Sequence, residues 1–117
     1  MKRGEIHRVK ADRIGAGKPG RRVLVVSREE LNRGYEVTIV PFNGSDFANK
    51  SKKPFCVPFN CGEFGLVKDC VAKCDEINRI YKNDLVTPSS PVGEISEDKL
   101  AEVLSAINWC LKSEPKK

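Results

Sequence analysis

The chain has little of what most catalytic and metal-binding sites need. It carries one histidine, His7, so hydrolytic triads and most histidine-based metal centres lack parts. No apolar run approaches the roughly 20 residues that span a bilayer. The basic residues at the N-terminus are not followed by an apolar stretch, as a secretory signal would require. We therefore expect a cytoplasmic protein without a membrane segment.

Cysteine is present in an odd number, which excludes a complete disulfide framework. The five are Cys56, Cys61, Cys70, Cys74 and Cys110. The first two pairs are separated by four and by three residues, wider than the two of a zinc knuckle. Cysteine as a small, buried apolar residue of a reducing compartment fits better. We expect no metal and no cofactor.

Charge is distributed unevenly along the 117 residues, which we expect to form one domain (1–112) with a charged tail (113–117). The formal net charge is +5, yet residues 1–33 alone hold ten Lys and Arg against four Asp and Glu. A basic N-terminal third suggests a surface for nucleic acid or another polyanion. A solvated face with ordinary asymmetry explains the same counts.

The hydrophobic pattern predicts short strands followed by one long helix. The expected strands are 5–10, 23–26, 36–42, 55–59, 66–72 and 77–81, with polar loops at 10–20 and 44–54. The strands 55–59 and 66–72 should form an antiparallel pair. This order predicts an α+β fold built on a small antiparallel sheet or partial barrel.

Two helix starts can be identified from capping residues. Ser27 and Glu30 have the spacing of a capping box for a short helix, which Gly34 would end in the left-handed conformation. Ser96 should cap the C-terminal helix, whose apolar face is Leu100, Val103, Leu104, Ile107 and Leu111. Trp109 lies outside this stripe, so it packs on another element or at a subunit contact.

A glycine-rich loop delivers Arg21 and Arg22 to the start of a buried strand. Adjacent strand residues point to opposite faces, so we expect only one of the two to face a given groove. The loop is not a nucleotide-triphosphate loop, because Asp12 and Pro19 stand where that motif needs a glycine and a hydroxyl residue. A fixed guanidinium here could hold a phosphodiester, or the pair could protect a strand edge.

The order of short motifs resembles the MazF/PemK family of RNA-cleaving toxins over about residues 3–111. The segments that carry the resemblance are Arg3-Gly4-Glu5-Ile6, Gly20 to Ser27, Thr38 to Asn43, Gly65 to Val71, and Val92 to Ser96. It implies a small, strongly bent antiparallel sheet close to an SH3-like partial barrel, with short helices and a C-terminal helix. It also implies a homodimer that holds single-stranded RNA across the dimer face.

The resemblance implies a reaction and its residues. The ribose 2′-hydroxyl attacks the neighbouring phosphate without metal, which gives a cyclic phosphate and a 5′-hydroxyl end. Arg21 matches the family arginine, and Asn43 stands where the family has Thr or Ser. An amide cannot relay a proton as a hydroxyl does, so Ser45 and His7 are candidates for proton transfer.

Further cations extend this expectation. Arg22 stands where the family usually has proline and adds a phosphate contact. Arg13 and Lys18 from the loop, with Arg79, should contact RNA, so binding should depend strongly on salt.

The hypothesis from sequence is therefore a toxin-type endoribonuclease restrained by an acidic, partly disordered antitoxin peptide. Two alternatives stay open. One is a non-catalytic module of the same fold that binds a protein such as gyrase, and the other is a regulatory dimer that has lost toxicity.

Overall fold

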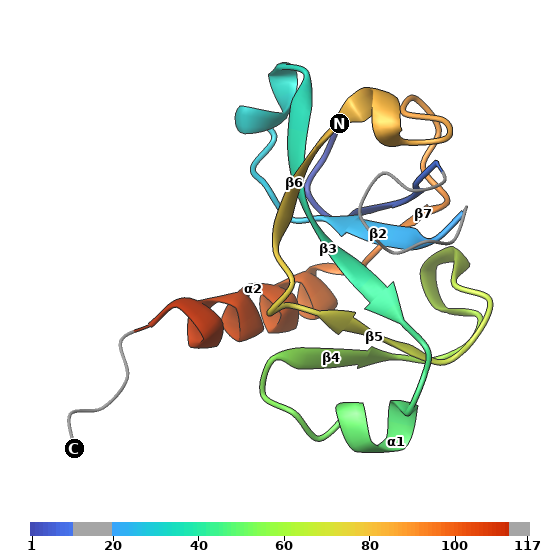
Figure 1. The fold of residues 1–117 in the computed structure, drawn as a ribbon, viewed down its shortest axis with the longest axis vertical. Coiled ribbons are helices and arrows are strands. Elements are labelled where there is room, and N and C mark those ends of the chain that lie inside the picture. The colour runs from blue at the N-terminus through green and yellow to red at the C-terminus, as the bar shows by residue number, and fades with distance from the viewer. Residues whose placement is uncertain (11–19, 113–117) are drawn as a thin grey trace.

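A single curved antiparallel sheet organises the molecule, which is described here from a computed structural model covering residues 1–10 and 20–112 (Figure 1). Within these residues the sheet has seven strands in the order β4-β5-β3-β2-β1-β7, and β6 pairs with β3. The strands are β1 (Glu5–Arg8), β2 (Arg22–Val25), β3 (Glu36–Asn43), β4 (Cys56–Phe59), β5 (Cys70–Lys73), β6 (Asn78–Tyr81) and β7 (Gly93–Glu94). The expected α+β fold with a strongly bent sheet is confirmed.

The helices are few and mostly short. They are α1 (Phe47–Lys50), α2 (Glu97–Leu111) and the 3-10 turns η1 (Leu31–Arg33), η2 (Glu63–Gly65) and η3 (Lys82–Asp84). The polar stretch 44–54, predicted to be a loop, therefore contains α1. None of the helices in the described residues has the length and apolarity of a membrane span.

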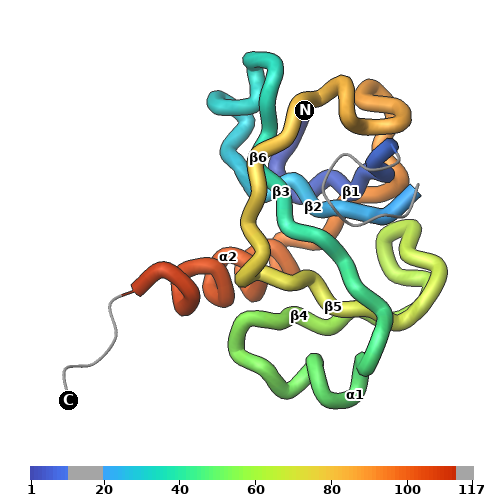
Figure 2. Tube along the Cα trace, viewed as in Figure 1, coloured from blue at the N-terminus to red at the C-terminus, as the bar shows by residue number. Residues whose placement is uncertain are grey.

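The long strand β3 connects the two halves of the sheet. Its first half pairs with β6 on one side and its middle with β2 on the other, and its last residues, Phe42 and Asn43, pair with β5. The chain path in Figure 2 shows β3 running from the β6 region to α1. The predicted pair of strands at 55–59 and 66–72 is present as β4 and β5, but the second begins only at Cys70.

Each side of the curved sheet buries its own apolar cluster. The larger one lies under α2 and includes Leu24, Phe42 and Phe59 from the sheet with Val103 and Ala106 from the helix. The smaller one is built from aliphatic residues: Val9, Val23, Val25, Val37, Ile39, Ile80 and Leu85. A sheet with both faces buried is held in register, because slipping by one residue would exchange the two sets.

Helix α2 begins where the sequence predicts, with the Ser96 hydroxyl accepting from the Lys99 N–H at 3.2 Å. The Lys99 ammonium donates to the Pro58 carbonyl at 2.7 Å and so ties the helix to β4. The predicted apolar face is partly wrong. Ala106 is buried, whereas Leu111 is 72% exposed.

Trp109 contacts another element of the same chain, one of the two arrangements expected. Its ring lies 6.3 Å, centroid to centroid, from that of Phe55, the residue directly before β4. The indole remains 46% exposed, so part of its apolar surface still faces solvent.

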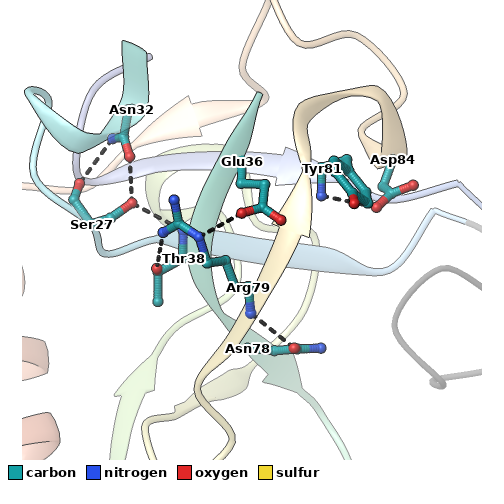
Figure 3. A network of polar contacts seen from close by, with 8 residues as sticks. All are labelled: Ser27, Asn32, Glu36, Thr38, Asn78, Arg79, Tyr81 and Asp84. Atoms are coloured by element: carbon teal, nitrogen blue, oxygen red, sulfur yellow. Dashed lines mark hydrogen bonds and ion pairs between the residues drawn. The ribbon is translucent and has the colours of Figure 1, made fainter. Parts of the chain in front are cut away.

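The predicted capping box at Ser27 is wrong, because a tertiary contact takes its hydroxyl (Figure 3). The Ser27 Oγ donates to the Asn32 side chain and accepts from the Thr38 N–H on β3. The turn that follows has no side-chain cap, and Gly34 is extended (φ −82°) rather than left-handed.

The outer edge of β6 is covered by side chains of β6 and of η3 (Figure 3). The Arg79 N–H donates to the side chain of Asn78 at 2.8 Å, and the Tyr81 N–H donates to that of Asp84 at 3.1 Å. These two amides point away from β3, since a strand amide that faces its neighbour would donate to it. The edge therefore presents no free donors at these two residues.

The segment after η2 is positioned by a close approach of two backbones. A Cβ at Gly93 in β7 would lie 1.8 Å from the Phe64 carbonyl oxygen, and one at Gly65 would lie 2.4 Å from that of Val92. Gly65 also has a φ of +84°, which favours glycine. These contacts fix where the chain leaves η2 toward Leu66.

Candidate functional site

A cleft of about 430 Å³ opens where the start of β2, the end of β3 and the segment before β5 meet. Its lining residues are Gly20, Arg21, Arg22, Phe42, Asn43, Gly44, Ser45, Leu66, Val67, Lys68 and Cys70. Three cationic side chains thus converge on one concave surface with an amide and a hydroxyl. Such a set binds an anion, since guanidinium groups recognise phosphate oxygens in pairs.

Both Arg21 and Arg22 line this cleft, contrary to the expectation that only one would face it. Arg22 is the first residue of β2, and Arg21 precedes the strand, so the alternation of strand residues does not separate them. The Arg21 Nε donates to the Phe42 carbonyl at 3.2 Å. This contact attaches the guanidinium of one wall to the strand that forms the other.

Arg22 has a buried side-chain donor, its Nε, without a hydrogen-bond partner among the described residues. A buried donor without a partner costs free energy, of the order of 1–3 kcal/mol or more when charged. Arg22 lines the cleft together with Cys70 and Lys68, so its positive charge acts on an anion bound there.

Asn43 is held by three donors, and they determine how its amide points. The side-chain Oδ1 accepts from the Ser45 N–H at 2.9 Å, the Ser45 hydroxyl at 2.8 Å and the Lys50 ammonium at 3.0 Å. An ammonium and a backbone N–H can only donate, so oxygen must face them. The Nδ2 group has no partner among the described residues and is left as a donor at the cleft wall.

Lys50 is the polar residue that sequence reasoning missed. Besides Asn43 it donates to the Ser45 Oγ at 2.9 Å. Lys50 comes seven positions after Asn43 in the sequence, and α1 brings it back beside the end of β3. Its position in a polar stretch expected to be a loop gave no sequence signal.

The thiol that lines the cleft is not a nucleophile at neutral pH. Burial raises the pKa of Cys70 to about 11, although Lys68 and Arg22 act in the opposite direction. The thiol therefore stays protonated, whereas nucleophilic cysteines are thiolates. Among the described residues, no group of three or more His, Cys, Asp or Glu could hold a metal ion.

His7 does not line the cleft. Its side chain is 1% exposed, and its Nε2 lies 2.8 Å from the Glu5 carboxylate within β1. This is the arrangement of a strand histidine whose ring is satisfied inside the fold.

Arg79 also lies outside the cleft. It donates to Glu36 at 2.9 Å and to Thr38 at 3.1 Å on the first half of β3 (Figure 3). Thr38 and Asn43 are five strand positions apart, which is about 16 Å along an extended strand. Arg13 and Lys18 fall outside the described residues, as does the tail 113–117.

Both the sequence and the fold resemble those of known proteins. The family model described as a PemK-like, MazF-like toxin of type II toxin–antitoxin system matches residues 2–111. No curated protein sequence matches the chain.

Solved structures with the same fold are numerous. The Mycobacterium tuberculosis toxin MazF-mt6 superposes with a TM-score of 0.71 at 22% identity, covering 91% of this chain and 94% of that one. An endoribonuclease in complex with its cognate antitoxin from a mycobacterial species gives 0.72 at 19% identity, covering 95% and 94%. MazF from Deinococcus radiodurans gives 0.71 at 19%, covering 95% and 96%.

Proposed function

Because the chain belongs to the PemK-like, MazF-like toxin family of type II toxin–antitoxin systems, whose members are known as endoribonucleases, we propose that it cleaves single-stranded RNA without a metal ion. The cleft at the start of β2 is the main support for this proposal. It assembles Arg21, Arg22, Asn43, Ser45 and Lys68 from distant segments around a space that suits a phosphodiester.

Each side chain of the cleft has a role in this reaction. The 2′-hydroxyl of the RNA attacks the adjacent phosphorus, and negative charge grows on the phosphate oxygens. Arg21 stabilises this charge, because its guanidinium is held in place before the substrate arrives. The free Nδ2 of Asn43 donates to the same phosphate and orients it.

The other cations act on binding. Arg22 adds a second positive charge beside Arg21 in the cleft, and Lys68 contacts a neighbouring phosphate. Arg13 and Lys18 remain proposed phosphate contacts on the strength of the sequence. Arg79 is available only to RNA that extends along β3, well beyond the cleft. The hydroxyl of Ser45 is the proton-transfer group that the site offers, since His7 is enclosed in β1.

The proposal includes an assembly. A homodimer in the cytoplasm would join two such clefts into a longer path for RNA. An acidic antitoxin peptide would cover the basic cleft and block it, because opposite charge attracts it there. Similar solved structures include a mycobacterial endoribonuclease bound to its antitoxin and MazE–MazF complexes of Deinococcus radiodurans.

The test is incubation of the purified protein with a long single-stranded RNA in EDTA, followed by end-group analysis. Fragments with 5′-hydroxyl ends support the proposal. Arg21→Ala should lower the rate by about 10²–10³-fold, the effect of removing one donor from a developing oxyanion. Arg28→Ala is the matched control, because Arg28 is an exposed arginine that pairs with Glu30 outside the cleft.

Intact RNA with the folded wild-type protein would overturn the proposal. It would favour a binding module, for which the absence of a hydroxyl at Asn43 is the supporting observation. A protein target, such as gyrase, would then be sought by testing inhibition of its activity.

A further inference from the structure

Lys50 stands behind Ser45 as seen from the cleft. Ser45 lines the cleft and is exposed, whereas Lys50 does not line it and is half-buried. The two are linked directly, with the Lys50 ammonium donating to the Ser45 Oγ at 2.9 Å. Helix α1, which follows β3 in Figure 1, carries the lysine to this position. A hydroxyl at the substrate surface is thus backed by an ammonium.

Three polar groups form a closed triangle at this corner of the cleft. Lys50 donates to Asn43 at 3.0 Å and to Ser45, and Ser45 donates to Asn43 at 2.8 Å. The Asn43 oxygen only accepts, so it cannot pass a proton on. The Ser45 hydroxyl both donates and accepts, and its hydrogen can rotate from Asn43 toward a bound substrate. Of the three hydrogen bonds in this triangle, only the one from Lys50 to Ser45 can pass a proton toward the substrate.

We propose that Ser45 and Lys50 form a proton relay that protonates the leaving 5′-oxygen, with Lys50 as its positioning and proton-supplying residue. This inference rests on the proposed function. As the 2′-oxygen bonds to phosphorus, its proton passes to water and the bond from phosphorus to the 5′-oxygen breaks. The leaving oxygen takes the Ser45 proton, and Ser45 takes one from the Lys50 ammonium. Water then returns a proton to the neutral Lys50 amine.

The relay supplies a general acid, which the other residues of the cleft do not provide. Leaving-group protonation is worth about 10²–10⁴-fold in such reactions, and Asn43 has no proton that it can give up. The two arginines keep theirs, since guanidinium is not deprotonated in proteins.

Lys50 could act in the relay or have a purely structural role, and a change of leaving group separates these two roles. A short RNA is made to span a cleavage site mapped with the wild-type protein. A second copy carries sulfur in place of the bridging 5′-oxygen at that site. A thiolate leaves without protonation, so general-acid catalysis no longer contributes.

Ser45→Ala should slow cleavage of the oxygen ester by about 100-fold and of the sulfur ester by less than about threefold. Lys50→Arg keeps a cation that can donate to Asn43 and Ser45 but does not release a proton. It should therefore show the same pattern, with a loss on the oxygen ester of at least about tenfold. Lys52→Arg, the same change at an exposed lysine beyond α1, should match the wild type on both.

Equal losses on the two substrates would overturn the relay, because they would show that the pair only positions Asn43 or the phosphate. Retention of full oxygen-ester activity in Lys50→Arg would overturn it as well. If the wild type leaves the long RNA intact, the proposed function itself fails, and this inference fails with it.

Discussion

The Arg21 Nε donates to the carbonyl oxygen of Phe42, the residue directly before Asn43. The cation that would stabilise a phosphate and the amide that would orient it are therefore joined through one backbone carbonyl. Their spacing is set by the β2–β3 pairing rather than by flexible side chains alone. Such a preorganised pair does not reorganise when charge develops, which is what makes electrostatic catalysis effective.

Asn43→Asp should abolish most activity while the fold is kept. The carboxylate is the same size and accepts the same three hydrogen bonds, but it loses the Nδ2 donor and adds a negative charge facing the phosphate. We expect a fall in kcat/KM of about 10²-fold or more. Asn108→Asp makes the same change on the exposed face of α2 and should leave the rate unaltered. An active Asn43→Asp variant would contradict the assigned role.

Lys68→Gln should reduce the salt dependence of RNA binding. Lys68 is exposed and lines the cleft, so it should neutralise one phosphate. Each contact to a single strand contributes about 0.7 to the slope of log K against log salt. The slope, measured with a 2′-O-methyl RNA that cannot be cleaved, should fall by about this amount. Lys112→Gln, at the end of α2, is the control, and an equal change in it would refute the local contact.

Gly93→Ala should destabilise the fold severely. Its Cβ would lie 1.8 Å from the Phe64 carbonyl, so one backbone must move. We expect the free energy of unfolding to fall by about 3 kcal/mol or more. Gly34→Ala has nothing within 4 Å of its Cβ and a φ of −82°, so its effect should stay within about 0.5 kcal/mol. Urea unfolding of both variants measures the difference.

The thiols should react in an order set by burial. Burial raises the pKa of Cys74 to about 12 and that of Cys70 to about 11, whereas Cys61 is exposed. At pH 8 a disulfide reagent should therefore label Cys61 first and leave Cys70 and Cys74 protected until the protein unfolds. Early labelling of Cys74, read by mass spectrometry, would contradict its burial.

The same shifts predict how stability changes in alkali. The native state holds the Cys70 and Cys74 protons more tightly than the unfolded chain does. The contribution of these two thiols to the free energy of unfolding is complete below the ordinary thiol pKa. It is lost as pH rises toward about 11 for Cys70 and about 12 for Cys74. The free energy of unfolding should fall through this window, and less steeply in Cys74→Ala when compared with its own value at pH 7.

Much of this architecture could be predicted from local pattern. The strands and the start of α2 at Ser96 follow from alternation and capping, which depend on neighbours in sequence. Ser27 shows the limit of local reasoning, because its hydroxyl accepts from the Thr38 N–H on β3 and donates to the Asn32 side chain instead of capping the turn that follows. The tertiary contact with Thr38 outweighs the local capping propensity of Ser27.

The site was predictable only in part for the same reason. Arg21, Asn43 and Ser45 were expected to share a site, and the fold gathers them around one cleft, where Arg22 joins them against the expectation from strand alternation. Lys50 could not be anticipated, because its place depends on a left-handed residue, Asp46 (φ 52°), that turns the chain into α1. No residue pattern near Lys50 predicts that turn.

The self-covered edge of β6 bears on how the protein behaves when it is abundant. Exposed strand edges template the stacking of identical chains into fibrils. Because the amides of Arg79 and Tyr81 are already engaged by Asn78 and Asp84, a second copy finds few donors to extend the sheet. This edge should therefore not seed a fibril when the protein is concentrated.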